Sequence, residues 1–173
     1  MPQKAVFLDR DGVINVERGT YTYLPDDFIV MKGVAEALEI FKINGFKIIV
    51  ITNQSGISQG IYTKEMMDAC HEKMKKECRS LIDDIFYAKW HPDISASLSR
   101  KPDSLMLERA IARHHIIPTE SWLIGDKERD VLSGMKVNLR TILIGSGNEK
   151  TQADYISENL LSAAHLIAAP ELH

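Results

Sequence analysis

Two aspartates, Asp9 and Asp11, follow a short apolar run near the start of this chain, in the stretch AVFLDRDGVIN. A carboxylate can act as a nucleophile toward phosphorus and form an aspartyl-phosphate. A second carboxylic acid nearby can protonate the leaving oxygen and then help deprotonate the water that cleaves the intermediate. Gly12, directly after the pair, makes a bend of the chain easier. The spacing is therefore suited to a nucleophile and a proton-transferring partner.

Two further carboxylates, Asp126 and Asp130, lie about one helical turn apart later in the chain. Together with Asp9 and Asp11 they offer oxygen ligands for a hard cation. Mg²⁺ suits such a site, because it keeps several waters and takes only one or two protein carboxylates plus a substrate phosphate. Without a cation, clustered carboxylates repel one another and one is driven to take up a proton. We therefore expect a Mg²⁺ site.

Potential phosphate-binding groups occur in three places. Thr52–Gly56 (TNQSG) offers a hydroxyl, amides and backbone N–H groups at an expected strand-to-loop transition, which favours an anion. Arg100 and Lys101 precede an expected helix, and Lys127 directly follows Asp126. Lysine and a metal ion together neutralise the charge of a phosphoryl group during its transfer.

Apolar runs that alternate with helical patterns predict the elements that position these residues. Strands are expected at Ala5–Leu8, Phe46–Thr52, Ile85–Trp90, Ser121–Gly125 and Leu139–Gly145, with a short sixth strand at 154–156. Helices are expected at Val34–Phe41 with a stop at Gly45, from an N-cap at Thr63 to about Ser80, from Asp103 or Ser104 to His114, at Glu128–Lys136 and at Asn159–Ala168.

This repeated strand–helix order predicts an α/β fold with a doubly wound parallel sheet, in a single domain over residues 1–173. Ligands of such sheets bind beyond the carboxyl ends of the strands. The polar residues that follow the first, second and fourth strands should therefore meet at one edge. The irregular segment 16–31 is too long for a simple turn, so we expect a small flap there.

Composition restricts the class of protein. The 173 residues are 45% apolar and 26% charged, with a formal net charge of −3, which is typical of a globular protein and argues against a nucleic-acid partner. No apolar run reaches the roughly 18 residues of a membrane span, and no signal-peptide layout is present, so a cytoplasmic protein is expected. Cys70 and Cys78 share one expected helix and lie about 12 Å apart along its axis, which excludes a disulfide.

Four motifs in order, DRDGVIN, TNQSG, RKP and GDKERD, resemble those of the haloacid dehalogenase-like (HAD) hydrolases over the stretch from Phe7 to Gly145. In finer detail, FLDRDGVINVERG, VITNQSGISQG, RKPDSLML and IGDKERD resemble the histidinol-phosphatase-like branch, whose members act on heptose 1,7-bisphosphate or histidinol phosphate. The resemblance implies a three-layer Rossmannoid sandwich with a mostly parallel sheet, a small flap and no large cap domain.

The resemblance also implies a role for each matching residue. Asp9 would be the nucleophile and Asp11 the general acid/base, while Thr52 and Lys101 would hold the phosphoryl group. Mg²⁺ would be bound by the Asp9 side chain, the Asp11 backbone carbonyl and Asp126, with Asp130 supporting the metal site. Substrate contacts are expected from Glu17, Arg18, Gly19, Thr20, Asn53, Gln54, Ser55, Arg100 and Lys127.

One loop departs from the branch. Many members hold a structural Zn²⁺ before RKP with three cysteines and one histidine, whereas the loop at 90–102, WHPDISASLSRKP, has His91 and no cysteine. Structural zinc requires four such ligands, so no structural Zn²⁺ is expected. Because this loop borders the entrance in the family, its change leaves the exact substrate open.

The leading hypothesis is thus a Mg²⁺-dependent phosphatase that removes the 7-phosphate from D-glycero-D-manno-heptose 1,7-bisphosphate, a small-molecule phosphate ester. Alternatives are a histidinol-phosphate phosphatase, a nucleic-acid-end phosphatase, which the net charge disfavours, and a non-catalytic binding module. The last would lack the nucleophile or Lys101, and both are present. A monomer is expected, although an open site can also be covered by a partner subunit.

Overall fold

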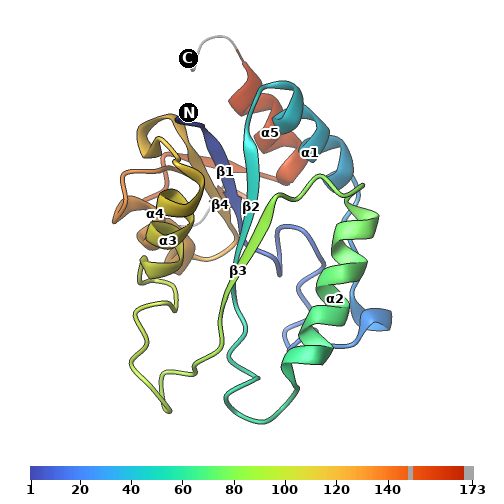
Figure 1. Ribbon diagram of the computed structural model, residues 1–173. Helices are drawn as coiled ribbons and strands as arrows, with labels where there is room; N and C mark the ends of the chain where they lie inside the picture. Colours follow the sequence, from blue (N-terminus) through green and yellow to red (C-terminus); the bar gives the residue numbers. More distant parts are fainter. Residues whose placement is uncertain (148–149, 170–173) are drawn as a thin grey trace.

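The computed structural model describes residues 1–147 and 150–169 and has a six-stranded parallel sheet at its centre (Figure 1). The strand order is β3-β2-β1-β4-β5-β6, and every neighbouring pair is parallel. The strands are β1 (Ala5–Leu8), β2 (Lys47–Asn53), β3 (Asp84–Ala88), β4 (Trp122–Gly125), β5 (Arg140–Ile144) and β6 (Tyr155–Ser157). The predicted doubly wound parallel sheet is confirmed.

Helices cover both faces of the sheet, which gives three layers (Figure 1). One face carries α1 (Val34–Ile43), α2 (Lys64–Glu77) and α5 (Leu160–Ala168), and the other carries α3 (Leu105–His114) and α4 (Glu128–Met135). Two short 3₁₀ helices, η1 (Pro25–Asp27) and η2 (Pro118–Glu120), lie in the connections. Among the described helices, none has the length and apolar content needed to cross a membrane.

Strand β1 lies inside the sheet, with β2 on one side and β4 on the other. Side chains alternate between the two faces of a strand, so an apolar run can serve two cores. Val6 and Leu8 pack in the cluster beneath α1 and α5, while Ala5 and Phe7 pack in the cluster beneath α3. None of these four side chains is exposed. The strand is thus a fixed support for the residues that follow it.

Most predicted boundaries differ from the observed ones by one or two residues, which is the usual uncertainty of element ends. The prediction for the third strand needs a correction, because β3 ends at Ala88 and leaves Trp90 outside. The cause is its position at the sheet edge: its one neighbour, β2, ends at Asn53, which is the partner of Ala88. The N-cap predicted at Thr63 is confirmed, since its hydroxyl accepts from the Met66 N–H.

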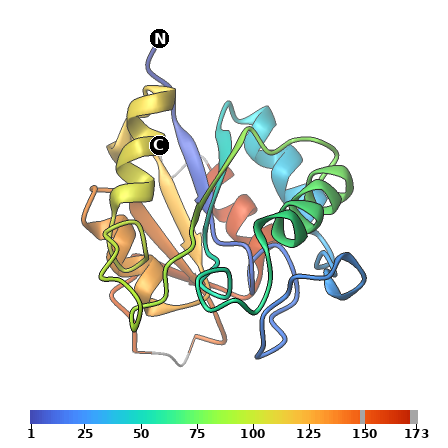
Figure 2. The same ribbon diagram turned by 60° about the horizontal axis from the view of Figure 1, so that its bottom comes forward.

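Residues 16–31 form the expected small flap, and no large cap domain occurs among the described residues. The two ends of the flap lie side by side, because the N–H of Val16 donates to Ile29 O and the N–H of Met31 donates to Ile14 O. In Figure 2 this segment, in blue, lies near the loop that follows β2. Cys70 and Cys78 are buried and free, so the prediction of unlinked thiols is confirmed.

Candidate active site

Asp9 lies directly after β1 and is almost completely buried. Its Oδ1 accepts a hydrogen bond from the backbone N–H of Arg10 at 2.8 Å and lies 2.9 Å from Nζ of Lys101. Burial raises the pKa of Asp9 to about 7, although Lys101 acts in the opposite direction. A buried carboxylate with these fixed donors is pre-oriented to react as a nucleophile.

Lys101 joins two buried carboxylates. Its Nζ lies 2.9 Å from Asp9 and 2.8 Å from Asp130 Oδ1, and it donates to the Ile51 carbonyl at 2.8 Å. Burial disfavours its charged form, but Asp130 and Asp9 outweigh that effect and raise the pKa of Lys101. Asn53 fixes its backbone from both sides, since it accepts from Lys101 N and donates to Lys101 O. The ammonium is thus charged and precisely placed.

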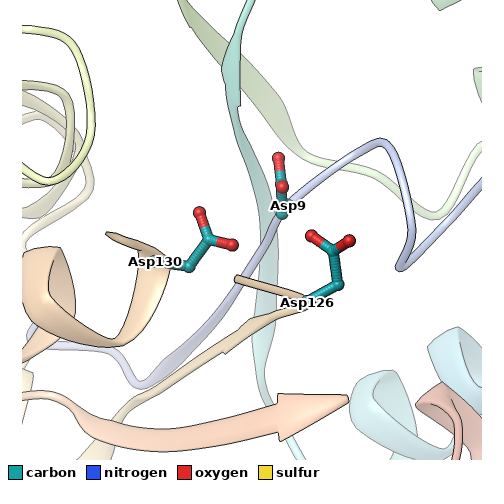
Figure 3. Close-up of side chains that lie close together, drawn as sticks. All are labelled: Asp9, Asp126 and Asp130. Atoms are coloured by element: carbon teal, nitrogen blue, oxygen red, sulfur yellow. The ribbon is translucent and has the colours of Figure 1, made fainter. Parts of the chain in front are cut away.

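Three carboxylates, those of Asp9, Asp126 and Asp130, face one another beyond the ends of β1 and β4 (Figure 3). One oxygen from each lies within 4.8 Å of the others. Two glycines make room for them. A Cβ on Gly12, which has φ +85°, would lie 2.3 Å from Asp126 Oδ2, and a Cβ on Gly125 would lie 2.2 Å from the Cβ of Asp130.

The donor set at this cluster fits Mg²⁺. Oδ1 of Asp126 is buried and has no hydrogen-bond partner among the described residues, and burial raises the pKa of this carboxyl group. Among the described residues, the cations that contact the three carboxylates are Lys101 and the half-exposed Lys127, whose Nζ lies 2.9 Å from Asp126 Oδ2. A divalent cation would satisfy the orphaned oxygen and offset the remaining negative charge.

The Asp11 carboxylate is not part of this cluster and is held by other groups. Its Oδ2 accepts from Arg10 Nε at 3.1 Å, while its Oδ1 accepts from Arg10 Nη2 at 3.0 Å and from Asn15 Nδ2 at 2.9 Å. About a quarter of the Asp11 side chain remains exposed to the adjoining cavity. An accessible carboxyl group beside a buried nucleophile is well placed for proton transfer.

The end of β2 and the loop after it bring polar groups to the same edge. Thr52 is buried, and its hydroxyl lies 2.9 Å from the side-chain amide of Gln54. The amide satisfies its neighbours best with its oxygen toward Thr52 and Arg10 and its nitrogen donating to the Tyr62 hydroxyl at 2.6 Å. Ser55 Oγ lies 3.3 Å from the hydroxyl of Tyr21 in the flap. The flap therefore contacts the expected phosphate-binding loop.

A cavity of about 540 Å³ opens beside these groups. It is lined by eight of the nine predicted substrate-binding residues: Glu17, Gly19, Thr20, Asn53, Gln54, Ser55, Arg100 and Lys127. Arg18 is not among them, because its guanidinium turns to Asp27 and forms an ion pair at 2.7 Å. Its role in substrate binding stays a prediction.

Three cavity residues, Arg10, Tyr21 and Arg129, were not predicted from the sequence. Arg129 lies within the motif GDKERD, and its positive charge beside two carboxylates is a signal that sequence reasoning could have used. Tyr21 lies in the expected flap, whose path no local pattern fixes. Arg10 stands between the two aspartates, but the sequence does not show which way a side chain points after a strand ends.

The cavity has a cationic side. Nη1 of Arg100 is buried without a hydrogen-bond partner among the described residues. Burial lowers the pKa of Arg100, and the positive charge of Arg129 lowers it further. Lys127 lines the same cavity. A buried guanidinium nitrogen without a partner, next to a second arginine, is unfavourable unless an anion joins them.

The chain resembles known proteins along most of its length. Residues 98–167 match the family model described as HAD-hydrolase-like. D-glycero-beta-D-manno-heptose-1,7-bisphosphate 7-phosphatase from Helicobacter pylori strain J99 is 37% identical over 149 residues, which cover 84% of each chain. The protein of that name from Escherichia coli K12 is 34% identical over 171 residues, which cover 90% of this chain and 89% of the relative.

Among solved structures, D,D-heptose 1,7-bisphosphate phosphatase from B. bronchiseptica, crystallised with magnesium and phosphate, superposes with a TM-score of 0.87. The sequence identity is 24%, and the match covers 95% of this chain and 97% of the other. At that identity the superposition establishes the fold, while the curated relatives establish the kinship. The chain therefore belongs to the HAD-like hydrolases, in the family of phosphatases that the D-glycero-beta-D-manno-heptose-1,7-bisphosphate 7-phosphatases represent.

Proposed function

We propose that this protein is a Mg²⁺-dependent phosphomonoester hydrolase that removes the 7-phosphate from D-glycero-D-manno-heptose 1,7-bisphosphate through an aspartyl-phosphate. The observation that carries the proposal is the buried Asp9 carboxylate, held 2.9 Å from the Lys101 ammonium and beside the orphaned oxygen of Asp126. The names of the relatives supply the substrate.

In the proposed first step, an oxygen of Asp9 forms a bond to phosphorus, and the bond between phosphorus and the sugar oxygen breaks. Asp11 gives its proton to that oxygen, so the sugar leaves as an alcohol. In the second step water attacks the aspartyl-phosphate and Asp11 takes up its proton. Inorganic phosphate forms and the Asp9 carboxylate is restored.

The remaining residues would bind and orient the phosphoryl group. Lys101 and the Thr52 hydroxyl would donate to its oxygens where negative charge accumulates. Asp130 would hold Lys101 in place, because it contacts the ammonium at 2.8 Å and is itself fixed by a hydrogen bond from Lys127 N at 3.1 Å. The Asp9 carboxylate, the Asp11 backbone carbonyl and Asp126 would hold Mg²⁺, which supplies further charge neutralisation when bound.

The cationic side of the cavity supports a substrate with two phosphates. The cavity that Asp11 lines is also lined by Arg100, Lys127 and Arg129. Nη1 of Arg100 has no hydrogen-bond partner among the described residues, and a bound anion would supply one. When one phosphate is at Asp9, the other phosphate of a bisphosphate can reach these cations. A monophosphate such as histidinol phosphate would leave them unpaired, so it should bind less tightly.

We also propose that residues 1–173 act as one domain, as a monomer and in the cytoplasm. The two buried free thiols, Cys70 and Cys78, are in keeping with a reducing compartment. Elution of the purified protein at the volume of a 19.5 kDa globular chain would support the monomer, and elution at twice that mass would refute it.

The test is phosphate release from heptose 1,7-bisphosphate, histidinol phosphate, single sugar phosphates and oligonucleotides with a terminal phosphate. Each is assayed with Mg²⁺ and with EDTA, for wild type, Asp9→Asn and the control Asp103→Asn, which changes a half-exposed carboxylate paired with Lys136. We expect Mg²⁺-dependent turnover of the bisphosphate far above the rest, lost only in Asp9→Asn. Equal turnover by Asp9→Asn would refute the mechanism. Preference for another substrate would refute the assignment of the substrate.

A further inference from the structure

Arg10 is a buried arginine between the two aspartates of the site. Its side chain is 1% exposed, whereas arginines are almost never fully buried unless paired. The guanidinium meets the Asp11 carboxylate as a fork, with Nε 3.1 Å from Oδ2 and Nη2 3.0 Å from Oδ1. Two parallel bonds fix the plane of the carboxylate as well as its position, which a single donor cannot do.

Besides the Gln54 oxygen in the loop after β2, the same guanidinium contacts the flap and α2. Nη2 also donates to the Thr22 carbonyl in the flap at 2.8 Å, and Nη1 lies 3.5 Å from Nε2 of His71 on α2. Its Cζ atom lies 5.5 Å from the ring centre of Phe28, at the far end of the flap. Arg10 therefore ties the strand that carries the nucleophile to the flap and to α2.

His71 is suited to accept from Arg10. Burial, and then the charge of Arg10, lower the pKa of His71 to about 4, so the ring is neutral at pH 7. The other charged groups that face it, Asp68, Asp11 and Lys75, do not reverse this shift. A neutral imidazole with its proton on Nδ1 offers the lone pair of Nε2 to the guanidinium.

We propose that Arg10 is a positioning residue, whose guanidinium holds the Asp11 carboxyl group in the orientation required for proton transfer and fastens the flap over it. The proposal rests on the function proposed above, in which Asp11 is the general acid/base. Without the fork, the Asp11 carboxylate keeps the single hydrogen bond from Asn15 Nδ2, which does not fix its plane, so the carboxyl group is aligned with the leaving oxygen only part of the time.

The leaving group separates this role from a purely structural one. An alkoxide from a sugar needs a proton as it departs, whereas p-nitrophenolate leaves without one. Misplacing Asp11 should therefore slow transfer from the sugar phosphate to Asp9 and leave transfer from p-nitrophenyl phosphate nearly unchanged. The burst of p-nitrophenolate in the first turnover reports that transfer alone, before the hydrolysis step that also uses Asp11.

The main variant is Arg10→Lys, which keeps the buried positive charge and removes the fork. The matched control is Arg113→Lys, at an exposed arginine that contacts Asp84 on the opposite side of the sheet from the flap. For Arg10→Lys we expect kcat on heptose 1,7-bisphosphate to fall about 100-fold, with KM and the p-nitrophenolate burst rate within about threefold of wild type. Hydrogen exchange should speed up at flap amides, because Thr22 O loses its donor.

Equal losses on both esters with a normal unfolding curve would overturn the proposal, as would an undiminished kcat. If Arg10→Lys does not fold, His71→Leu replaces it, with His71→Gln as its conservative partner. The leucine removes the acceptor behind the guanidinium, so we expect kcat on heptose 1,7-bisphosphate to fall about threefold in His71→Leu while the p-nitrophenolate burst rate stays unchanged. His71→Gln keeps an acceptor and should have near-normal activity. An undiminished kcat in His71→Leu would then overturn the proposal.

Failure of the proposed function would look different. If the wild-type protein hydrolyses neither ester, or if Asp9→Asn retains activity, the phosphatase mechanism is wrong. The tie between Arg10 and the flap is then still tested by hydrogen exchange, which needs neither substrate nor metal. Flap exchange that is equal in Arg10→Lys and Arg113→Lys would show that Arg10 does not fasten the flap.

Discussion

The Lys101 ammonium and the Asp9 carboxylate form a 2.9 Å ion pair in which both side chains are almost completely withdrawn from water. Withdrawing two opposite charges costs several kcal/mol per ion before their attraction is counted, so such a pair is weak evidence of a stabilising role. Here it holds the carboxyl group of Asp9, the proposed nucleophile, beside a charged donor. Stability and reactivity at this centre are thus coupled through Lys101.

Replacing Lys101 should harm both properties. In Lys101→Met the carboxylates of Asp9 and Asp130 lose their shared cation inside the protein. We therefore expect the free energy of unfolding, measured in urea, to fall by about 3–5 kcal/mol and turnover to vanish. The double variant with Asp130→Asn should recover part of the stability but no activity. Lys136→Met, at a half-exposed pair with Asp103, is the control and should change stability by less than about 1 kcal/mol.

Gly12 should be irreplaceable for a steric reason. In Gly12→Ala the new Cβ meets Asp126 Oδ2 at 2.3 Å, and the residue must also keep a φ of +85°. We expect a loss of about 1–2 kcal/mol from the backbone alone, a displaced Asp126 and at least tenfold weaker Mg²⁺ binding by calorimetry. Gly60→Ala is the matched control, since its φ is +71° but nothing lies within 4 Å of the new Cβ. Equal Mg²⁺ affinity in the two variants would contradict this account.

His71 makes stability depend on pH. Its pKa is lowered from 6.5 to about 4 by burial and by Arg10, so the folded state favours the neutral ring. The unfolded chain takes up the proton first, and stability is therefore fully present above pH 6.5 and decreases as the pH falls toward 4. The full change is about 3 kcal/mol at 1.36 kcal/mol per unit.

Urea unfolding between pH 4 and pH 8 measures this effect, with His71→Gln compared to wild type. The difference in free energy of unfolding between the two proteins should shrink as the pH falls through this window. His115→Gln, at an exposed histidine, serves as the reference and should leave the slope unchanged. A wild-type slope that persists in His71→Gln would assign the pH dependence to other groups.

Aromatic stacking should govern the position of the flap. Tyr23 stacks on Tyr62 at 5.2 Å with nearly parallel rings, and Tyr21 meets the same ring edge-on at 5.7 Å. Such pairs contribute about 0.5–1.5 kcal/mol beyond their buried area. We expect Tyr23→Leu to raise KM by about threefold to tenfold with a smaller change in kcat, as measured by steady-state kinetics. Tyr23→Phe keeps the ring and should behave as wild type.

Arg129 should discriminate between substrates with one and two phosphates. It lines the cavity with Arg100, whose Nη1 has no hydrogen-bond partner among the described residues. Arg129→Ala should raise KM for heptose 1,7-bisphosphate at least about tenfold, since a hydrogen bond to a charged group contributes roughly 1.5–3 kcal/mol net of solvent. KM for a heptose 7-phosphate should hardly change. Equal effects on KM for both substrates would show that Arg129 does not bind the second phosphate.

The arrangement of the acidic residues could be predicted from the sequence because one rule governs it. Parallel strands end at the same edge, so residues just after β1 and β4 must meet there, and Asp9 and Asp126 do. The continuous apolar pattern of Phe46–Thr52 required a strand buried on both faces, which β2 is. In these cases local pattern and global topology agree.

Side-chain direction outside the regular elements could not be predicted in this way. Arg18 turns to Asp27 instead of the cavity, and Arg10 turns inward to Asp11. After a strand ends, the direction of each side chain depends on turn geometry and on partners distant in sequence, such as Thr22 and His71. The end of β3 likewise depended on where β2 stops and not on its own apolar residues.

The interior location of β1 separates two kinds of change that a sequence can undergo. The carboxylate of Asp9, the proposed nucleophile, directly follows a strand with neighbours on both sides, while the flap and the segment 90–99 lie outside the sheet. We expect that those outer segments can change in length or composition, apart from the flap contact at Thr22, while Asp9 and Asp126 keep their places at the ends of β1 and β4. We therefore expect substrate preference to evolve separately from the chemistry, so that changes in the flap and in the segment before Arg100 can alter the preferred substrate of this fold.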